Sequence, residues 1–567
     1  MNNKDIIKII KKTAELMELH EENVFKIRSF QNAIFKLERL EQPLTHLSAE
    51  ELVKIDGIGK SLALVIAQII ESGSHSALDN LLEQTPQGVL DMLTIKGVGP
   101  KKIRLLWKEL ALENLDDLLQ ACEDNKVDKV KGFGEKTQEN IKEAILFKAS
   151  VSGQLHYAEA EALVAEIDKV LKDAGVLKWS STGDFKMKRE VISQLNWLIA
   201  DMDTNTIEQR LSSEEIIDWD KQKSGPLTLR GKFRSNPISV EFRFCDQAEF
   251  GSLLLTKSAS SQHLSMLNEE NKTLLEIAIK EPFASEEAIY EKANWPFIVP
   301  EMREGLAEIE FLKNGKAPNL LEISDLKGIL HNHSTYSDGK HSLREMAIYC
   351  KELDFEYLGI SDHSRSAFYA QGLEEEAILK QRKEIDELNE ELKPFKIFKG
   401  IESDILNDGS LDYSAKVLAS FDFIVASIHS NLNMDSKKAT ERLIKAIANP
   451  YTTMLGHPTG RLLLRREGYP IDHKAVIDAC AYYGVIIEIN ANPWRLDLDW
   501  RWVHYAMEKN VMLSINPDAH EKAGYEDMKY GVYVGRKGGL TKEMTFNTKS
   551  LKEVADHFEN RLKKANK

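Results

Sequence analysis

GILHNHSTYSDG, residues 328–339, decides the fold of the C-terminal half of the chain. In this stretch two histidines and an aspartate follow directly after a short apolar run. The same order recurs further along, where an apolar run of strand length ends and a side chain of a metal-ligating type follows. The side chains of this series are His331, His333, Asp338, His363, Glu402, His429, His457, Asp518 and His520. Their regular placement predicts a site with several metal ions.

The apolar runs themselves predict a parallel sheet. They are rich in β-branched residues and do not alternate with polar ones, which is typical of strands buried on both faces. The clearest runs are residues 357–360, 423–428, 485–489 and 511–515, and helix-permissive stretches such as 375–392 and 437–448 lie between them. In such strand-then-helix folds the side chains at the carboxyl ends of the strands converge on one face.

Scattered core or surface histidines are the alternative. Of the 15 histidines, ten lie from residue 331 onward, and six of those ten fall at or just after predicted strand ends. Unrelated histidines would not keep that phase. Imidazole mixed with carboxylate, without cysteine, favours zinc, manganese or iron. Because the series has too many ligands for one ion, we predict two or three divalent ions, which together suit phosphate-ester hydrolysis.

The elements HxH, SDH, GIE, IHS, GHP and DAH, in this order, resemble the PHP (polymerase and histidinol phosphatase) domain over about residues 326–540. The resemblance implies a distorted β/α barrel with a trinuclear metal site, in which all nine positions of the series are ligands. Arg461, four residues after His457, is a candidate catalytic contact to a phosphate, with a surface salt bridge as the alternative. Asn490 and Arg495 are candidates to line the cleft.

Composition limits what else the chain does. Its 567 residues suffice for several domains, and four cysteines far apart in sequence, without a CxxC motif, indicate a reducing, cytoplasmic compartment. The N-terminus has no cleavable apolar segment, and the longest apolar run, residues 62–70, is too short to span a bilayer. We therefore expect no membrane partner. A net charge of −15 argues against coating DNA by bulk electrostatics but leaves local contacts open.

The first 150 residues repeat a glycine motif that supplies such contacts. IDGIGK (55–60), IKGVGPKK (95–102) and VKGFGEK (130–136) share two glycines around an apolar residue, followed by a basic residue at the start of a predicted helix. Glycine permits the tight turn, and the helix N-terminus offers free amides to an anion. The motifs resemble helix-hairpin-helix turns, which implies gripping of DNA phosphates, often with a bound monovalent cation. The DNA-binding candidates are Gly57, Gly59, Lys60, Gly97, Gly99, Lys101, Lys102, Gly132, Gly134 and Lys136.

Helix-hairpin-helix repeats before a PHP domain resemble the bacterial family X DNA polymerases over essentially the whole chain. The resemblance implies a multidomain α plus α/β protein with a polymerase-beta-like nucleotidyltransferase palm and thumb between the two flanks. The implied domains are an N-terminal helical domain with the first helix-hairpin-helix (1–80), a fingers-like helix-hairpin-helix region (81–150), a degenerate palm (151–265), a thumb and linker (266–325) and the PHP phosphoesterase domain (326–567).

The palm departs from the family pattern. Along TGDFKMKREVISQLNWLIA (182–200), Asp184 stands where a phosphate-binding serine belongs, and the metal-binding Asp-x-Asp pair becomes Gln194 and Asn196. The third carboxylate falls on Glu241. Neutral amides do not supply the charge that holds two magnesium ions, so we expect the palm to have lost nucleotidyl transfer. The alternative is that Asp201 and Asp203 take over through a shift in register.

The sequence thus predicts a metal-dependent phosphodiesterase on DNA, most simply a 3′–5′ exonuclease in DNA repair. The family resemblance implies manganese as the activating ion, while the ligand types alone also admit zinc. The protein's partner would be DNA at primer ends, gaps or nicks, and we expect a monomer. Three other functions stay open: a polymerase with a still active palm and an attached exonuclease, a small-molecule phosphatase, and a non-catalytic DNA-binding scaffold. The related removal of 3′-phosphates and cleavage at abasic sites are not separated from exonuclease activity by the sequence.

Overall fold

The computed structural model describes residues 1, 3–38, 40, 42–95 and 97–566. The chain divides into two compact units, Met1–Ser152 and Gly153–Lys567. Lys96, which belongs to the second glycine motif, lies outside the described residues.

The first unit is built from helices around one apolar core. Its first helix shows why, since Ile6, Ile10 and Met17 recur at helical spacing and are buried on one stripe. The helices of this unit are α1 (Asn3–Leu19), α2 (Val24–Leu37), α3 (Ala49–Leu52), α4 (Lys60–Ser72), α5 (Ser76–Glu83), α6 (Gln87–Met92), α7 (Pro100–Leu110), α8 (Leu115–Glu123) and α9 (Glu135–Ser150).

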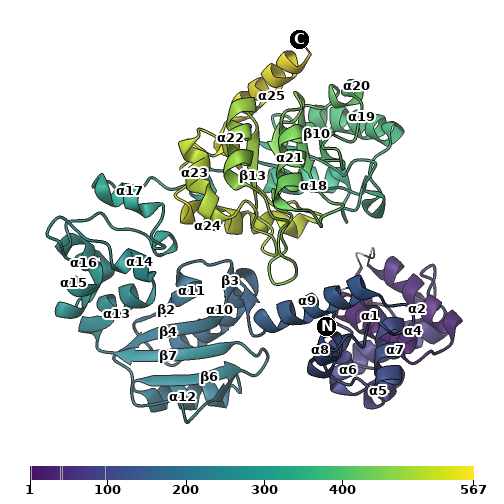
Figure 1. Ribbon diagram of the computed structural model, residues 1–567, viewed down its shortest axis with the longest axis horizontal. Helices are drawn as coiled ribbons and strands as arrows, with labels where there is room; N and C mark the ends of the chain where they lie inside the picture. The colour runs from purple at the N-terminus through teal and green to yellow at the C-terminus, as the bar shows by residue number, and fades with distance from the viewer. Residues whose placement is uncertain (2, 39, 41, 96, 567) are drawn as a thin grey trace. The chain divides into compact units, whose positions relative to one another are not determined.

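The second unit begins with a mixed sheet, which we call the palm sheet (Figure 1). Its strand order is β2-β4-β7-β6-β5, and only the central pair β4 and β7 runs parallel. A separate antiparallel pair, β1 with β3, lies beside α10. The elements are β1 (Leu155–His156), α10 (Tyr157–Asp173), β2 (Trp179–Thr182), α11 (Gly183–Lys186), β3 (Val191–Ile192), β4 (Gln194–Ala200), α12 (Thr204–Ser213), β5 (Ile217–Trp219), β6 (Thr228–Phe233) and β7 (Ser239–Cys245).

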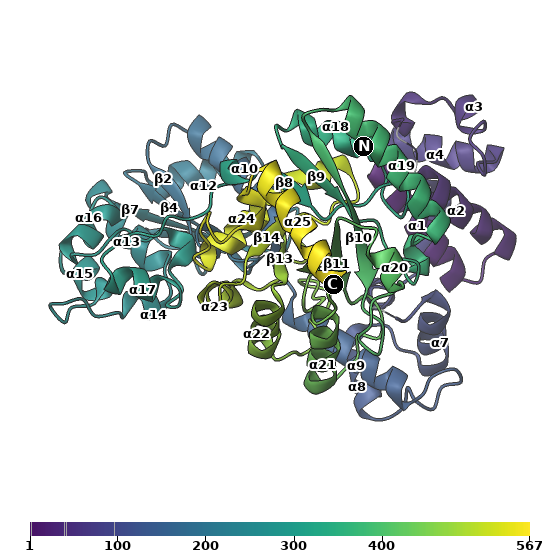
Figure 2. The ribbon, with the colours of Figure 1, turned by 90° about the horizontal axis from the view of Figure 1, so that it is seen from above.

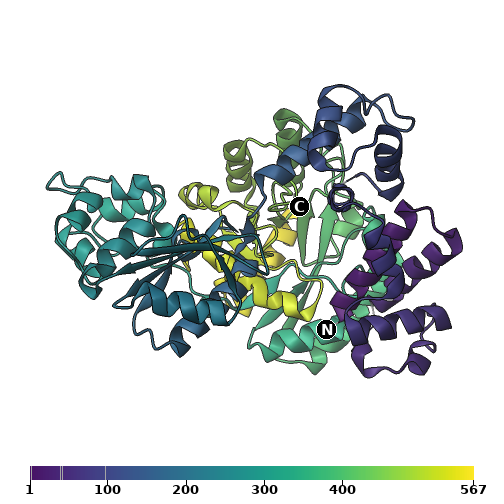
Figure 3. The same ribbon diagram turned by 90° about the horizontal axis from the view of Figure 1, so that it is seen from below.

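A small helical subdomain follows, with a core of its own. Its first helix contacts β4 and β2, and Figure 3 shows the group beyond one end of the palm sheet. The helices are α13 (Phe250–Lys257), α14 (Ser261–Leu264), α15 (Leu274–Lys280), α16 (Glu286–Lys292) and α17 (Glu308–Lys313).

The last part is a barrel of parallel strands in the order β14-β13-β12-β11-β10-β9-β8. Asn332, just after β8, bridges in parallel to Ala519, just after β14, and brings the two edges together. Figure 2 shows helices around the strands. The strands are β8 (Gly328–Leu330), β9 (Tyr357–Ile360), β10 (Lys396–Asp404), β11 (Phe423–Ser427), β12 (Met454–Leu455), β13 (Ile486–Asn490) and β14 (Leu513–Asn516), and the helices are α18 (Leu343–Glu352), α19 (Glu375–Glu391), α20 (Ala415–Leu418), α21 (Ser436–Ile447), α22 (His473–Tyr483), α23 (Val503–Glu508), α24 (Met528–Lys537) and α25 (Leu551–Ala565).

This architecture confirms the predicted fold class, a helical N-terminal region followed by a mixed sheet and a β/α barrel. The buried apolar residues of the palm sheet and of the barrel belong to one contiguous cluster, so the two share a core. Within the described ranges, no helix is long and apolar enough to cross a membrane. The cysteines are unpaired.

Candidate metal centre and palm pocket

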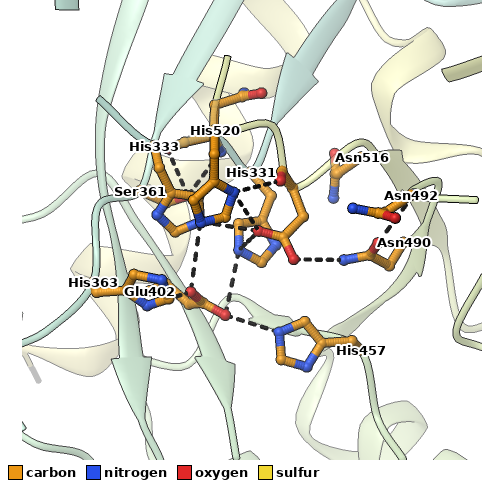
Figure 4. Close-up of polar contacts among 12 residues, drawn as sticks. His331, His333, Ser361, His363, Glu402, His457, Asn490, Asn492, Asn516 and His520 are labelled. Atoms are coloured by element: carbon orange, nitrogen blue, oxygen red, sulfur yellow. Dashed lines mark hydrogen bonds and ion pairs between the residues drawn. The ribbon is translucent and has the colours of Figure 1, made fainter. Parts of the chain in front are cut away.

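The barrel carries the predicted ligand series at the carboxyl ends of its strands. His331 and His333 follow β8, His363 follows β9, and Glu402 lies within β10. Asp338 lies further along the segment after β8, and the remaining members come after β11, β12 and β14. Because parallel strands end on one face of a barrel, residues up to 189 positions apart meet there (331 to 520). Figure 4 shows His331, His363 and His457 close to Glu402.

The nine side chains form four overlapping groups whose ligand atoms lie within 4.8 Å of one another. Every predicted member belongs to at least one group. The groups are His333, Asp338, His363 and His520; His331, Glu402 and His457; His331, His333 and Asp518; and His363, Glu402 and His429.

Glu402 lies at the centre of this cluster and is fully buried. Its Oε1 lies 3.0 Å from His457 Nε2 and 3.1 Å from His429 Nε2, while its Oε2 lies 2.9 Å from His363 Nδ1. Glu402, a buried carboxylate shared by several imidazoles, would hold metal ions together with them.

Two supporting carboxylates were not among the predicted residues. His331 Nδ1 donates a hydrogen bond to Glu488 at 2.6 Å, and His429 Nδ1 donates one to Asp404 at 2.5 Å. These bonds fix the tautomer and leave each Nε2 toward Glu402, as outer carboxylates do for metal-ligating histidines. The sequence signal was present, since Glu488 interrupts an apolar strand and Asp404 lies two residues after Glu402 on the same strand.

The protonation of the cluster follows from its crowding. Burial alone would lower the pKa of His429, but Glu402 and Asp404 raise it to about 10. Burial opposes a rise at His520 too, yet Asp338 and Asp518 raise its pKa to about 9. Although burial favours the neutral acid, the surrounding histidines hold the pKa of Glu402 well below its ordinary value. The cluster therefore holds ionised carboxylates that attract cations.

The donor set fits divalent metal ions. His363 Nδ1 and Glu402 Oε2 are buried and 2.9 Å apart, yet neither has a hydrogen-bond partner. His457 Nδ1 is also buried without a partner. Buried polar atoms normally have hydrogen-bond partners. Nitrogen and oxygen atoms without partners inside a histidine and carboxylate cluster are therefore the atoms that a metal ion would bind.

The Arg461 side chain lies in a network of ion pairs and hydrogen bonds. Its guanidinium donates to Asp499 at 2.6 Å, to Glu190 at 3.1 Å and to the carbonyl oxygens of Arg495 and Leu496. The structure thus has the ion pairs that were the alternative for this arginine, and the phosphate contact stays a prediction. The cationic side chain beside the cluster is that of Arg495, whose Nε lies 3.9 Å from Asp518 Oδ2.

The three glycine motifs adopt one conformation. Gly57, Gly97 and Gly132 have φ angles of 87°, 84° and 92°, which favour glycine because other side chains rarely adopt them. The second glycine of each motif is the N-cap of the following helix, α4, α7 or α9. The turns are exposed at both glycines, while the apolar residue between them packs inward. Lys60 is exposed in the first turn of α4, whereas Glu135 opens α9.

Family models match three segments of the chain. The model described as a helix-hairpin-helix domain matches residues 1–75, and one described as a SAM-like helix-hairpin-helix tandem matches residues 89–145. The model of the PHP domain matches residues 330–492.

One relative matches from end to end. The "DNA polymerase/3′-5′ exonuclease PolX" of Bacillus subtilis (strain 168) is 35% identical over 567 residues, which is 98% of this chain and 99% of that protein. The chain belongs to the bacterial family X DNA polymerases. Proteins named as probable phosphatases match part of this family X chain. One from Thermoanaerobacter sp. (strain X514) is 29% identical over 28% of the chain and 67% of its own length, and one from Shewanella oneidensis is 37% identical over 18% of the chain and 38% of its own length.

The palm of this family X chain has a pocket at the position expected for its metal site. Asn196 on β4 pairs in register with Glu241 on β7, and Gln194 donates to the Asn196 side chain at 2.9 Å. A cavity of about 260 Å³ opens there, lined by Thr182, Gln194, Asn196, Trp197, Leu198, Glu241, Arg243 and Lys257. Three of the four predicted palm positions, Gln194, Asn196 and Glu241, therefore converge with one carboxylate among them, whereas Asp184 is not a lining residue.

Cationic side chains lie beside the Glu241 carboxylate. Arg230 Nε donates to Glu241 at 2.8 Å, and Lys257 Nζ lies 4.0 Å away. Asp184 is likewise paired, accepting from Arg189 at 3.1 Å and from Ser193 at 2.9 Å.

Asp201 and Asp203 lie beyond the other end of β4. Asp201 accepts from the Gln247 amide, and Asp203 caps α12. They come five and seven residues after Asn196, past the end of β4, roughly 15 Å or more at strand spacing. The register-shift alternative is therefore not what the structure shows.

Proposed function

We propose that this chain is a metal-dependent 3′–5′ exonuclease that removes nucleotides from DNA ends during repair. The convergence of nine histidine and carboxylate side chains at one end of the barrel carries this proposal. The relative named as a polymerase and 3′–5′ exonuclease supports the choice of DNA, as do three exposed glycine turns that open helices.

The nine side chains of the ligand series would hold two or three ions. Family resemblance favours manganese, while the ligand types also suit zinc. When bound, such ions lower the pKa of a water and withdraw charge from phosphoryl oxygens.

Arg495 is the proposed substrate contact beside this cluster, and Asn490 supports the neighbouring Asp518. Arg495 is mostly buried next to Asp518, and Asn490 Nδ2 donates to Asp518 Oδ2 at 3.2 Å. A guanidinium there neutralises a phosphodiester and orients it toward the cluster. Asn490 fixes the carboxylate, so that Asp518 keeps one rotamer.

The first unit would hold the DNA. Amides at the N-termini of α4, α7 and α9 bind backbone phosphates, with a monovalent cation at the glycine turns, and read no base sequence. We place the protein in the cytoplasm with its DNA, as a monomer.

The palm is proposed to be a scaffold without nucleotidyl transfer. Its pocket retains one carboxylate, and Arg230 neutralises that one. Two magnesium ions need more negative charge than Glu241 with two amides provides.

One gel tests both statements. A 5′-labelled primer on a longer template is incubated with the protein, manganese and all four nucleotides. We expect shortening that disappears in the variant His331→Ala/His333→Ala. Extension by the wild-type protein would overturn the palm proposal, and an unchanged primer would overturn the exonuclease proposal.

A phosphomonoesterase is the second candidate, favoured by the probable phosphatases that match the barrel. The rate of hydrolysis of a small aryl phosphate distinguishes a phosphomonoesterase from an exonuclease. Hydrolysis faster than that of DNA, without competition from added DNA, would favour the phosphatase.

A further inference from the structure

The palm contacts the rim of the metal centre through its short strand pair. β1 and β3 pair at Leu155↔Ile192 and His156↔Val191, and Glu190 lies just before β3. These residues face two barrel segments, which we call the rim loops: residues 457–466, which begin at the ligand His457, and residues 492–498, which carry Arg495.

Glu190 reaches both rim loops through Arg461. The Glu190 carboxylate accepts from Arg461 Nη2 at 3.1 Å, and both side chains are largely buried, 11% and 16% exposed. The same guanidinium donates to the carbonyl oxygens of Arg495 and Leu496. One palm carboxylate thus orients a cation of the first loop, and that cation fixes the backbone of the second.

His156 makes a second, independent contact. Its Nε2 donates to the Leu463 carbonyl oxygen at 2.9 Å, and its ring packs 5.6 Å from that of Trp494. The Leu463 amide in turn donates to the Trp494 carbonyl oxygen at 2.7 Å. His156, at the end of β1, is therefore hydrogen-bonded to a residue more than 300 positions away (156 to 463).

The rim loops have one more clamp of their own. The Asp497 carboxylate accepts from the amides of Thr459 and Gly460 at 2.8 Å and 3.0 Å. This clamp ties the loops to each other but not to the palm. Glu190 and His156 are what anchor the pair from outside the barrel.

Other palm contacts to the barrel avoid the rim loops. Glu161 on α10 accepts from Lys529 Nζ at 2.8 Å and from the Tyr530 hydroxyl at 2.7 Å, both on α24. Glu161 therefore offers a matched control, an acid of the same palm that pairs with the same barrel away from the metal rim.

We propose that Glu190, acting through Arg461, is a positioning residue of the barrel site, with His156 as its auxiliary. The palm then has a second use: it holds Arg495 in place for a phosphate. This inference rests on the proposed hydrolysis of phosphodiesters. Removing the Glu190 charge leaves a buried guanidinium short of one partner and frees the loop it holds.

The first test compares Glu190→Gln with Glu161→Gln in the full chain. Hydrogen exchange of peptides covering the rim loops needs no activity. We expect faster exchange there in Glu190→Gln and wild-type exchange in Glu161→Gln. We also expect kcat on DNA to fall roughly 10- to 100-fold in Glu190→Gln, the range for outer residues that orient a site, with Mn²⁺ stoichiometry unchanged. Equal exchange and equal kcat in both variants would overturn the proposal.

A double-mutant cycle asks whether the effect passes through Arg495. If it does, Glu190→Gln costs nothing further in an Arg495→Ala background, because residues acting in one chain are not additive. Additive losses would mean that Glu190 acts by general stability, against the proposal. If the wild-type protein hydrolyses no DNA, the proposed function fails, and the exchange experiment alone still decides whether Glu190 anchors the rim loops.

Discussion

The metal centre and the palm pocket are two sites of the same kind in different states. In each, strands bring polar side chains to a common point. The barrel has filled its point with nine ligand-type residues and supports them with Glu488 and Asp404. The palm keeps the register of Asn196 and Glu241 but has one carboxylate, already paired with Arg230. The two sites thus share a convergence of strands and differ in the number of carboxylates and in the contacts that those carboxylates make.

The contrast between the two sites depends most on whether the barrel cluster carries the exonuclease activity. Replacing His331 and His333 by alanine removes two buried ligands, and we expect exonuclease activity to fall by roughly 1,000-fold or more, since metal ions supply several kcal/mol to such reactions. His504→Ala, a half-buried histidine on α23 outside the cluster, should be near wild type. Retained activity in the double variant would move the chemistry elsewhere.

Support by outer carboxylates is the next difference to test. Glu488→Gln keeps the shape of the side chain but weakens its hold on His331 Nδ1. We expect roughly a 10- to 100-fold loss in metal affinity or activity. Calorimetric titration with Mn²⁺ and exonuclease rates measure the two effects. A neutral result would show that His331 is oriented by packing alone.

Much of this site was predictable, and the reasons differ by residue. The nine ligand-type residues were found because strand ends repeat in phase along the chain, which is a local signal. Glu488 and Asp404 were missed because an acid inside a buried strand does not say which imidazole it meets. The partner of Arg461 could not be predicted, because Glu190 lies 271 residues away and no spacing rule reports such a contact.

In the palm, the family pattern laid on residues 182–200 placed Gln194 and Asn196 at the positions of metal ligands, and both line one pocket with Glu241. The pairing of Asn196 with Glu241 follows from the parallel strands β4 and β7. The cations that neutralise Glu241 could not be foreseen, because Arg230 comes from β6 and depends on the antiparallel register of that strand.

Metal binding to the barrel should depend steeply on pH. His429 and His520, with pKa values raised to about 10 and about 9, carry protons at neutral pH in the absence of metal. An ion must displace those protons, so affinity rises with pH below these values, by about tenfold per pH unit for each proton released. Titrations with Mn²⁺ between pH 6 and pH 8, in buffers of different ionisation enthalpy, measure the slope. An affinity independent of pH would contradict this protonation.

Added charge should make the palm pocket a metal site. Gln194→Asp with Asn196→Asp places two carboxylates beside Glu241. A shared His331→Ala/His333→Ala background leaves the group of His363, Glu402 and His429 the same in the variant and its parent, so the difference between them reports on the palm. We expect Mg²⁺ to stabilise this variant more than its parent, by roughly 3 kcal/mol at a concentration about 100-fold above Kd. Equal stabilisation of the two proteins would contradict this prediction.

The smallest expected effect is on the salt dependence of DNA binding, and it differs between the first and third glycine turns. Lys60 opens α4, whereas Glu135 opens α9 and places negative charge where a phosphate would bind. Lys60→Ala should weaken DNA binding for all sequences and reduce the slope of log K against log salt by about one. Glu135→Lys should strengthen DNA binding and increase that slope, because it replaces an acid by a cation at a helix N-terminus, where free amides favour a phosphate. Anisotropy titrations over a range of salt concentrations, with the exposed Lys383→Ala of α19 as the control, measure both slopes. If the two variants shift binding in the same direction, the third turn does not contact the DNA backbone as the first does.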